Sequence, residues 1–216
     1  MTMRLRYKPF ALPELHENKL VYFDPKENKG RWKEIFGNDN PIHIEIGAGR
    51  GGFIKELALR NPDINYIAVE MDEKIFVYTG RMFLEEEENI QNVRLLKDKA
   101  ENLAEFFEED EVDKIYINFS NPWPKKKHHK RRITHPRQLV NYVKILKNGG
   151  LVEFKTDDRP FFEDSLDYFE ENGFEILDYT FDLTEEYKAD NIVTEYERKW
   201  RKRDIPINYL KAKLNK

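Results

Sequence analysis

Pro41-Ile-His-Ile-Glu-Ile-Gly-Ala-Gly-Arg-Gly-Gly52 is the stretch that decides the fold, because its alternating apolar residues end in a run of glycines. The alternation predicts a strand, and the glycines predict a tight turn after it. Gly47 and Gly49 have no Cβ and tolerate positive φ, so the backbone can turn sharply and approach a ligand closely. The residues that follow place apolar side chains on one helical face: Phe53, Ile54, Leu57 and Ala58. A helix that begins here aims unpaired N–H groups at the turn, so we expect a small-molecule cradle.

A second predicted strand, residues 64–72, carries the acidic residue Glu70 near its carboxyl end. A carboxylate at that place accepts hydrogen bonds from a ribose diol in open α/β sheets. A dinucleotide fold would supply the same acid, but its turn reads G-x-G-x-x-G, whereas this turn reads G-A-G-R-G-G. Glu45, just before the turn, suits a positively charged ligand better than a pyrophosphate. The segment resembles motif I of the class I AdoMet-dependent methyltransferases, whose cofactor, S-adenosyl-L-methionine (AdoMet), carries a sulfonium and an ammonium group.

Length and composition indicate one α/β domain with a sizeable core, since the chain has 216 residues. No apolar run approaches the length of a membrane span, so we expect no membrane partner. The chain has no cysteine, which excludes a disulfide framework and a thiolate metal site. The first residues lack the apolar core of a signal peptide, and we therefore expect a cytoplasmic protein. We also expect that it holds no metal.

The distribution of charge points to a polyanionic partner, although the net charge is −4. The stretch from Lys114 to Val152 contains no Asp or Glu, where an even spread would place about seven. The same stretch contains ten Lys or Arg residues. Basic residues also occur among prolines in residues 1–40, which we interpret as an N-terminal basic arm ahead of a single domain at residues 41–216. This arm either orders on a polyanion or packs over the sheet.

The pattern of the whole chain predicts a Rossmann-like α/β fold. It is a doubly wound, mostly parallel seven-stranded sheet with helices on both faces and an antiparallel last strand. Besides the first two strands, we expect strands at residues 93–97, 112–120, 151–157, 174–182 and 193–203. We expect further helices at residues 31–36, 73–88, 102–107, 136–147 and 161–171.

The predicted fourth strand runs into Asn121-Pro-Trp-Pro124, which stops the strand and stiffens the loop. Residues 125–132 follow with six Lys or Arg and two His. Cations attract phosphates and Trp123 offers a flat surface for a base, so the loop favours nucleic-acid binding. Two alternatives are a solvated basic face with Trp123 in the core, and a nuclear-address segment. Adjacent histidines among cations are poor metal ligands.

Several motifs together resemble the bacterial tRNA (guanine-N7)-methyltransferases of the TrmB family over essentially the whole chain. They are N-F-S-N-P-W-P-K-K-K-H-H-K-R-R at residues 118–132, E-I-G-A-G-R-G at 45–51, F-K-T-D-D at 154–158 and T-E-Y-E at 194–197. The resemblance implies transfer of a methyl group from AdoMet to N7 of a guanine in the variable loop of tRNA. Monomer and homodimer both remain open.

The resemblance also implies roles for particular residues. Cofactor binding falls to Glu45, Gly47, Gly49, Glu70, Lys99 and Asn121. Substrate binding falls to Lys125, Asp157, Thr194, Glu195, Tyr196 and Glu197. Asn121 takes the catalytic position, where the family has an aspartate. The family also has an acid where this chain has Lys99, with Asp98 one place early.

Asn121 is compatible with the implied chemistry. Guanine N7 already has a free lone pair, so attack on the methyl group needs no general base and can depend on alignment. An amide orients a base or the cofactor through its carbonyl, although it stabilises positive charge less than a carboxylate does. Three other readings stay open: an RNA-binding protein that keeps the fold but has a weakened site, an AdoMet enzyme with another substrate, and a non-enzymatic RNA-binding module.

Overall fold

The computed structural model describes residues 7–23, 25–86 and 89–216. Its strands are β1 (Val21–Tyr22), β2 (Ile42–Ile46), β3 (Asn65–Val69), β4 (Val93–Leu96), β5 (Val112–Asn118), β6 (Leu146–Thr156), β7 (Phe174–Thr180) and β8 (Asn208–Leu214). Its α-helices are α1 (Ala11–Glu17), α2 (Trp32–Phe36), α3 (Gly52–Arg60), α4 (Glu73–Glu85), α5 (Leu103–Phe106), α6 (Pro136–Ile145), α7 (Arg159–Glu171) and α8 (Glu195–Arg201). The short 3-10 segments that it describes are η1 (Pro25–Asn28), η2 (Ala100–Asn102) and η3 (Lys126–Arg131).

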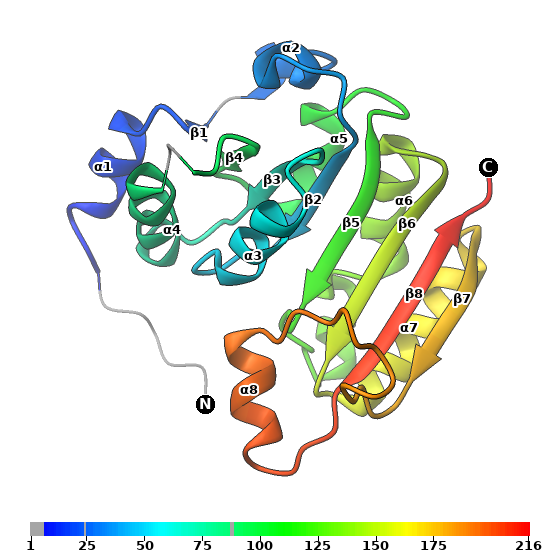
Figure 1. Ribbon diagram of the computed structural model, residues 1–216. Coiled ribbons are helices and arrows are strands. Elements are labelled where there is room, and N and C mark those ends of the chain that lie inside the picture. The colour runs from blue at the N-terminus through cyan, green and yellow to red at the C-terminus, as the bar shows by residue number, and fades with distance from the viewer. Residues whose placement is uncertain (1–6, 24, 87–88) are drawn as a thin grey trace.

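These strands form one sheet in the order β1-β4-β3-β2-β5-β6-β8-β7 (Figure 1). Neighbours from β1 to β6 pair in parallel, and β8 is antiparallel to both β6 and β7. The predicted Rossmann-like class is therefore confirmed. From β2 the strand order runs outward through β3 and β4 on one side and through β5 and β6 on the other. Ligands bind outside the carboxyl ends of the strands at such a switch point.

Two features of the predicted sheet are wrong. In the described part of the chain the sheet has eight strands instead of seven, because the two-residue strand β1 adds to its edge beside β4. The strand expected at residues 193–203 is the helix α8, and the antiparallel last strand is β8. A helix begins there because Thr194 caps it: the Thr194 hydroxyl oxygen accepts a hydrogen bond from the Glu197 amide at 3.0 Å. The predicted helix at 73–88 ends at Glu85, and residues 87–88 lie outside the described part.

The segment before β2 packs against the sheet and its helices where the structure describes it. Asn18 donates a side-chain hydrogen bond to the Gly80 carbonyl at 3.0 Å, which ties α1 to α4. The Trp32 ring is fully buried and its Nε1 donates to the Phe106 carbonyl at 2.9 Å. The basic residues Arg4 and Arg6 of the predicted arm lie outside the described residues. The division into an arm and a domain at residue 41 stays a prediction.

The two faces of the sheet have separate apolar cores, as the two-residue period of a strand requires. Ile42, Ile44 and Ile46 of β2 point into the core beneath α5, α6 and α7. The opposite core includes Tyr66, Ala68 and Tyr116 and is covered by α1, α3 and α4. Glu45, between the isoleucines, therefore faces the α3 side. Among the described residues, none of the helices is both long and apolar enough to cross a membrane.

Candidate active site at the carboxyl ends of the central strands

The glycine turn between β2 and α3 is pinned to β3 on one side and open on the other. The amides of Gly47 and Ala48 donate to the Val69 carbonyl at 2.8 and 3.1 Å. Gly47 and Gly49 have φ of +77° and +57°, values that L-residues rarely adopt. A Cβ built on Gly47 would meet no atom within 4 Å, so the turn borders free space. The turn lies where the sequence predicted it, and its role as a ligand cradle stays a prediction.

Glu70 links the glycine turn to the segment after β3. Its Oε2 accepts a hydrogen bond from the Gly49 amide at 3.1 Å, and its Oε1 accepts one from the Asp72 amide at 2.9 Å. Each carboxylate oxygen has two lone pairs, so both can accept one more donor. Glu70 thus holds the turn and keeps the capacity to bind two hydroxyl groups.

Glu45 lies at the end of β2 with 3% of its surface exposed. Its Oε1 accepts a hydrogen bond from the Asn118 side chain at 3.1 Å, whereas its Oε2 has no partner among the described residues. Burial raises the pKa of Glu45 to about 8, and the Glu70 charge adds to the rise, against the opposing effects of the Asn118 hydrogen bond, the Lys155 charge and, least, the backbone amide of Ile54. A buried acceptor without a donor is costly. An ammonium group in the cradle would supply that donor, so the residues present fit AdoMet.

The loop after β5 is a turn that Asn121 stabilises. The Asn121 side-chain oxygen accepts a hydrogen bond from the Trp123 amide at 3.1 Å, and Trp123 has a φ of +45°. Asn121 itself is exposed in the loop, three residues beyond the end of β5. Arg132, by contrast, is only 2% exposed: its Nε donates to the Pro122 carbonyl at 2.7 Å and its guanidinium pairs with Asp164. Arg132 therefore fixes this loop from inside.

The other cations of the segment face outward. The exposed ones are Lys125, Lys126, Lys127, Lys130 and Arg131. Trp123 is only half-exposed, with the Arg131 guanidinium 5.0 Å from its ring centre and the His128 ring edge-on at 5.8 Å. One face of the tryptophan is thus covered by the basic segment itself.

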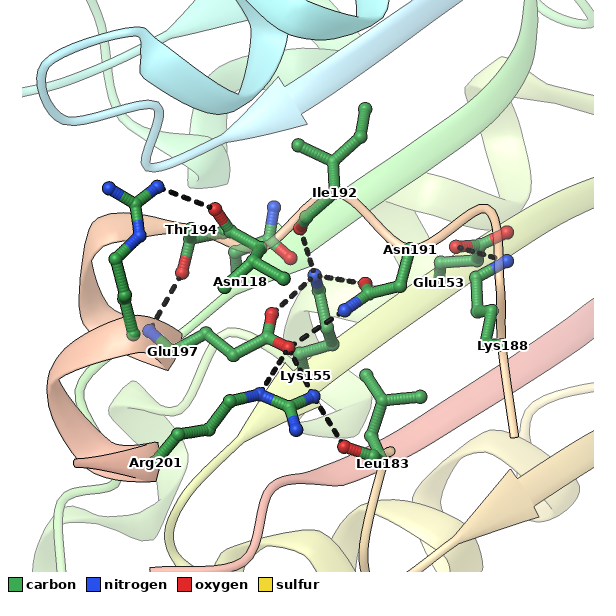
Figure 2. Close-up of polar contacts among 12 residues, drawn as sticks. Asn118, Glu153, Lys155, Leu183, Lys188, Asn191, Ile192, Thr194, Glu197 and Arg201 are labelled. Atoms are coloured by element: carbon green, nitrogen blue, oxygen red, sulfur yellow. Dashed lines mark hydrogen bonds and ion pairs between the residues drawn. The ribbon is translucent and has the colours of Figure 1, made fainter. Parts of the chain in front are cut away.

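A buried ionic cluster fastens α8 and the loop before it to β6 (Figure 2). The Lys155 ammonium donates to the Asn191 side chain and the Ile192 carbonyl at 3.0 Å and to Glu197 Oε2 at 3.1 Å. Glu197 is completely buried, and its Oε1 accepts from Asn191 and from two nitrogens of Arg201.

The pKa values of this cluster follow from burial and pairing. Burial lowers the pKa of Lys155, although Glu197 opposes that shift. Burial alone would raise the pKa of Glu197, but Lys155, Arg201 and Asn191 outweigh it and hold that pKa below its usual value. The carboxylate of Glu197 therefore stays ionised, and the ion pair anchors α8 beside the carboxyl ends of β5 and β6 (Figure 1).

Comparison with known proteins identifies the family. The model of a methyltransferase family described as "Putative methyltransferase" matches residues 39–210. The tRNA (guanine-N(7)-)-methyltransferase of Clostridium tetani (strain Massachusetts / E88) is 50% identical over 212 residues, which span 98% of this chain and 100% of that protein. The chain belongs to the TrmB family of methyltransferases. The TrmB relative from Clostridium botulinum (strain Okra / Type B1) is 45% identical over 216 residues, with 98% of this chain and 100% of that protein covered.

Solved structures share the fold with this TrmB-family chain. An antibiotic-related methyltransferase superposes with a TM-score of 0.64 at 20% identity, and the 16S rRNA methyltransferase KamB with a TM-score of 0.66 at 15% identity. Each superposition covers 87% of this chain and 94% of the other. At these identities the likeness concerns the fold alone.

The residues that the TrmB resemblance singled out lie in the segments that follow the carboxyl ends of the strands. Lys99 is exposed at the start of η2, after β4, while the preceding Asp98 accepts hydrogen bonds from the Lys99 amide and the Asn102 side chain. Asp157 follows β6, and burial raises its pKa. Thr194 caps α8, whose residues Glu195 and Tyr196 are exposed. The roles of all these residues stay predictions.

Four further residues of the site were missed in the sequence: Asn118, Lys155, Asn191 and Arg201. One pattern points to Lys155. It lies in the predicted strand between Phe154 and Thr156, and a lysine that is buried in a strand must find a polar partner. The T-x-x-E pattern at Thr194 also marks a helix start. No local pattern indicates the partners Asn191 and Arg201.

Proposed function

We propose that the protein transfers a methyl group from AdoMet to N7 of a guanine in the variable loop of tRNA. The observation that carries the proposal is that two features lie together at the carboxyl ends of the strands. One is the buried acid Glu45, which has an oxygen without a donor, and the other is the exposed basic loop after β5. The first suits a cationic cofactor, and the second suits a polyanionic substrate. Membership of the TrmB family supports the same pairing.

Glu45, Glu70 and the glycine turn hold the cofactor. With AdoMet bound, Glu45 Oε2 would accept a hydrogen bond from its ammonium group; this cation would favour the ionised carboxylate, whose proton goes to solvent, and would supply the missing donor. Glu70 accepts from the ribose hydroxyls, because both of its oxygens have a lone pair left beside their backbone donors. Gly47 leaves space for the approach. Lys99, which is exposed after β4 with Asp98 beside it, is assigned to the cofactor by the family resemblance alone.

The exposed cations of the loop and of α8 bind tRNA phosphates. Arg198, Lys199, Lys202 and Arg203 line a hollow of about 420 Å³ on α8 together with Glu195. Lys125 begins the other basic surface, which continues through η3. Both surfaces adjoin the end of β5, so a tRNA held between them brings a base to the cofactor. Each phosphate contact releases counterions and makes the binding dependent on salt.

Alignment performs the reaction, and no proton has to move. When bound, AdoMet supplies an electrophilic methyl group: the guanine N7 lone pair forms the new N–C bond, the C–S bond breaks with its electron pair going to sulfur, and the positive charge passes to the guanine ring. Asn121 orients the base or the cofactor at the end of β5 and removes no proton. Correct alignment of two reactants can account for about 7 kcal/mol or more of the barrier.

Tritiated methyl transfer from AdoMet to unmodified bulk tRNA, with free guanosine as a parallel acceptor, tests the proposal. We expect label in tRNA and none in guanosine. Label in guanosine would indicate a small-molecule enzyme. Absence of label in both, with tRNA still bound, would indicate an RNA-binding protein.

A charge-matched pair of variants tests the basic loop. Lys126→Gln/Lys130→Gln should weaken tRNA binding and lower the slope of log K against log salt by about 0.7–0.9 for each lost phosphate contact. Lys29→Gln/Lys33→Gln removes the same charge near α2, at the opposite end of the molecule from α8 (Figure 1), and should leave the slope nearly unchanged. Equal slopes in both variants would contradict the assignment of the loop.

A further inference from the structure

Asn118 lies between the buried acid Glu45 and the buried cation Lys155. The three residues come from three strands, and β5, which carries Asn118, lies between β2 and β6 in the sheet. Asn118 pairs in register with Lys155, and Tyr116, two residues before Asn118, pairs with Glu45. Side chains two residues apart in a strand share a face, so these side chains project from the same face of the sheet. Asn118 therefore separates the two charged groups (Figure 2).

The two charged groups have different partners in the folded chain. Asn118 Nδ2 donates to Glu45 Oε1 at 3.1 Å, whereas Glu45 Oε2 has no donor among the described residues. The Lys155 ammonium donates to three acceptors, two in the loop before α8 and one, Glu197, in α8 itself. An ammonium group has three N–H donors, so Lys155 has none left for Glu45.

An ion pair between Glu45 and Lys155 is the competing arrangement. Neighbouring strands are about 4.8 Å apart, which puts β2 and β6 about 10 Å apart, a span that a glutamate and a lysine side chain can close together. Their charges already interact: burial raises the pKa of Glu45, and the Lys155 charge opposes that rise. Opposite charges attract strongly where water is excluded. Such a pair would occupy Glu45 Oε2 and would draw Lys155 away from Glu197.

We propose that Asn118 is a positioning residue that prevents this ion pair and so keeps Glu45 Oε2 available to the ammonium group of AdoMet. The proposal rests on the proposed function, because it assigns AdoMet to the space beside Glu45. The Asn118 amide fills the space between the two charges, and its hydrogen bond holds Oε1 toward β5, which leaves Oε2 for a ligand. Lys155 in turn stays on Glu197 and keeps α8 anchored. Asn118 acts through Glu45 and touches no reacting atom.

Calorimetric titration with AdoMet tests the proposal through a rescue. Asn118→Ala removes the amide and opens the gap, so it should weaken AdoMet binding roughly 10- to 150-fold, the range of one hydrogen bond to a charged group. Asn118→Ala/Lys155→Met also removes the competing cation and should bind AdoMet more tightly than Asn118→Ala does. Lys155→Met alone should not raise the affinity, because Asn118 already blocks the ion pair.

Asn215→Ala is the matched control for the loss of an amide. Asn215 follows β8 and donates its side-chain hydrogen bond to the Glu175 carboxylate at 3.2 Å, so the substitution breaks a bond of the same kind away from the carboxyl ends of the parallel strands. This variant should keep the unaltered AdoMet affinity. Asn118→Ser opens a similar gap and takes the place of Asn118→Ala if that variant does not fold.

The pH dependence of unfolding without AdoMet gives a second readout. In the unaltered protein burial raises the folded pKa of Glu45 to about 8, so its contribution to stability is lost as the pH rises through that pKa. If Asn118→Ala only loses a hydrogen bond, this pKa rises further and the loss remains. If Glu45 instead pairs with Lys155, the pKa falls and the loss between about pH 5 and pH 7.5 disappears. Glu70, the other charged group that acts on Glu45, is the same in all variants.

Three results of the titrations would overturn the proposal: an unchanged AdoMet affinity in Asn118→Ala, no gain from adding Lys155→Met to it, or an equal loss of affinity in Asn215→Ala. A pH-dependent loss of stability in Asn118→Ala as large as in the unaltered protein would also overturn it. Absence of AdoMet binding by the unaltered protein would instead overturn the proposed function on which the proposal rests.

Discussion

Replacement of Glu45 by glutamine should remove a pH dependence that the buried carboxyl gives to folding. Burial raises the pKa of Glu45 from 4.5 to about 8 in the folded chain. A group with a raised folded pKa stabilises the fold fully below its unfolded pKa, and this contribution is lost as the pH rises through the folded pKa. Each pH unit between the two values corresponds to about 1.4 kcal/mol. This one group should therefore lower the free energy of unfolding by about 3 kcal/mol between pH 5 and pH 7.5.

Urea unfolding at several pH values, in the absence of AdoMet, measures the effect. A glutamine side chain cannot ionise but can still accept the Asn118 hydrogen bond, so Glu45→Gln is a matched control for every other titrating group. The difference in unfolding free energy between the two proteins should grow by about 3 kcal/mol in favour of the variant from pH 5 to pH 7.5. Parallel pH curves would refute the reasoning, because they would mean that Glu45 ionises at its ordinary pKa despite its burial.

Other substitutions test the remaining parts of the site. Glu70→Ala should weaken AdoMet binding by about 1–3 kcal/mol, since the ribose hydroxyls lose their acceptor; an unchanged affinity in a calorimetric titration would place the ribose elsewhere. Lys155→Met should lower the free energy of unfolding by about 3 kcal/mol. Lys155→Met/Glu197→Leu should recover part of that loss, because the uncompensated carboxylate has gone. If the effects of the two single substitutions on the free energy of unfolding simply add, the data would argue against the ion pair. Asn121→Asp should raise the methylation rate through the charge of the carboxylate, and Asn121→Ala should lower it roughly 10- to 1000-fold. With AdoMet saturating, so that the ionisation of Glu45 does not limit cofactor binding, the rate of the unaltered protein should stay nearly flat from about pH 6 to 9, and a steep profile would then reveal a general base.

The sequence predicted the parts of the fold that depend on local patterns. The strand–turn–helix unit around Gly47 needs only alternation, glycines and one apolar helix face, and the structure has it where expected. The two-residue strand β1 carries no pattern of its own, because its place is fixed by pairing with β4. Residues 193–203 alternate like a strand, yet the Thr194 cap and the buried partner of Glu197 make them helical.

The candidate site divides in the same way. Glu45 and Glu70 could be placed from the ends of predicted strands, since parallel strands bring their carboxyl ends to one edge. Lys155 and Asn191 are 36 residues apart, and their contact depends on how a loop folds back over β6. Arg132 looked like one more phosphate-binding cation, because a run of basic residues does not reveal which member turns inward to meet Pro122 and Asp164.

The position of the new methyl group in tRNA is the most direct measurement of what this protein does. Methylation at guanine N7 makes the ring susceptible to borohydride reduction, after which aniline cleaves the RNA chain at that nucleotide. An unmodified tRNA incubated with AdoMet and the protein should show one cleavage, in the variable loop, and the same tRNA without AdoMet should show none. Cleavage at another place, or methylated RNA that resists aniline, would contradict the assignment of guanine N7 in the variable loop as the acceptor.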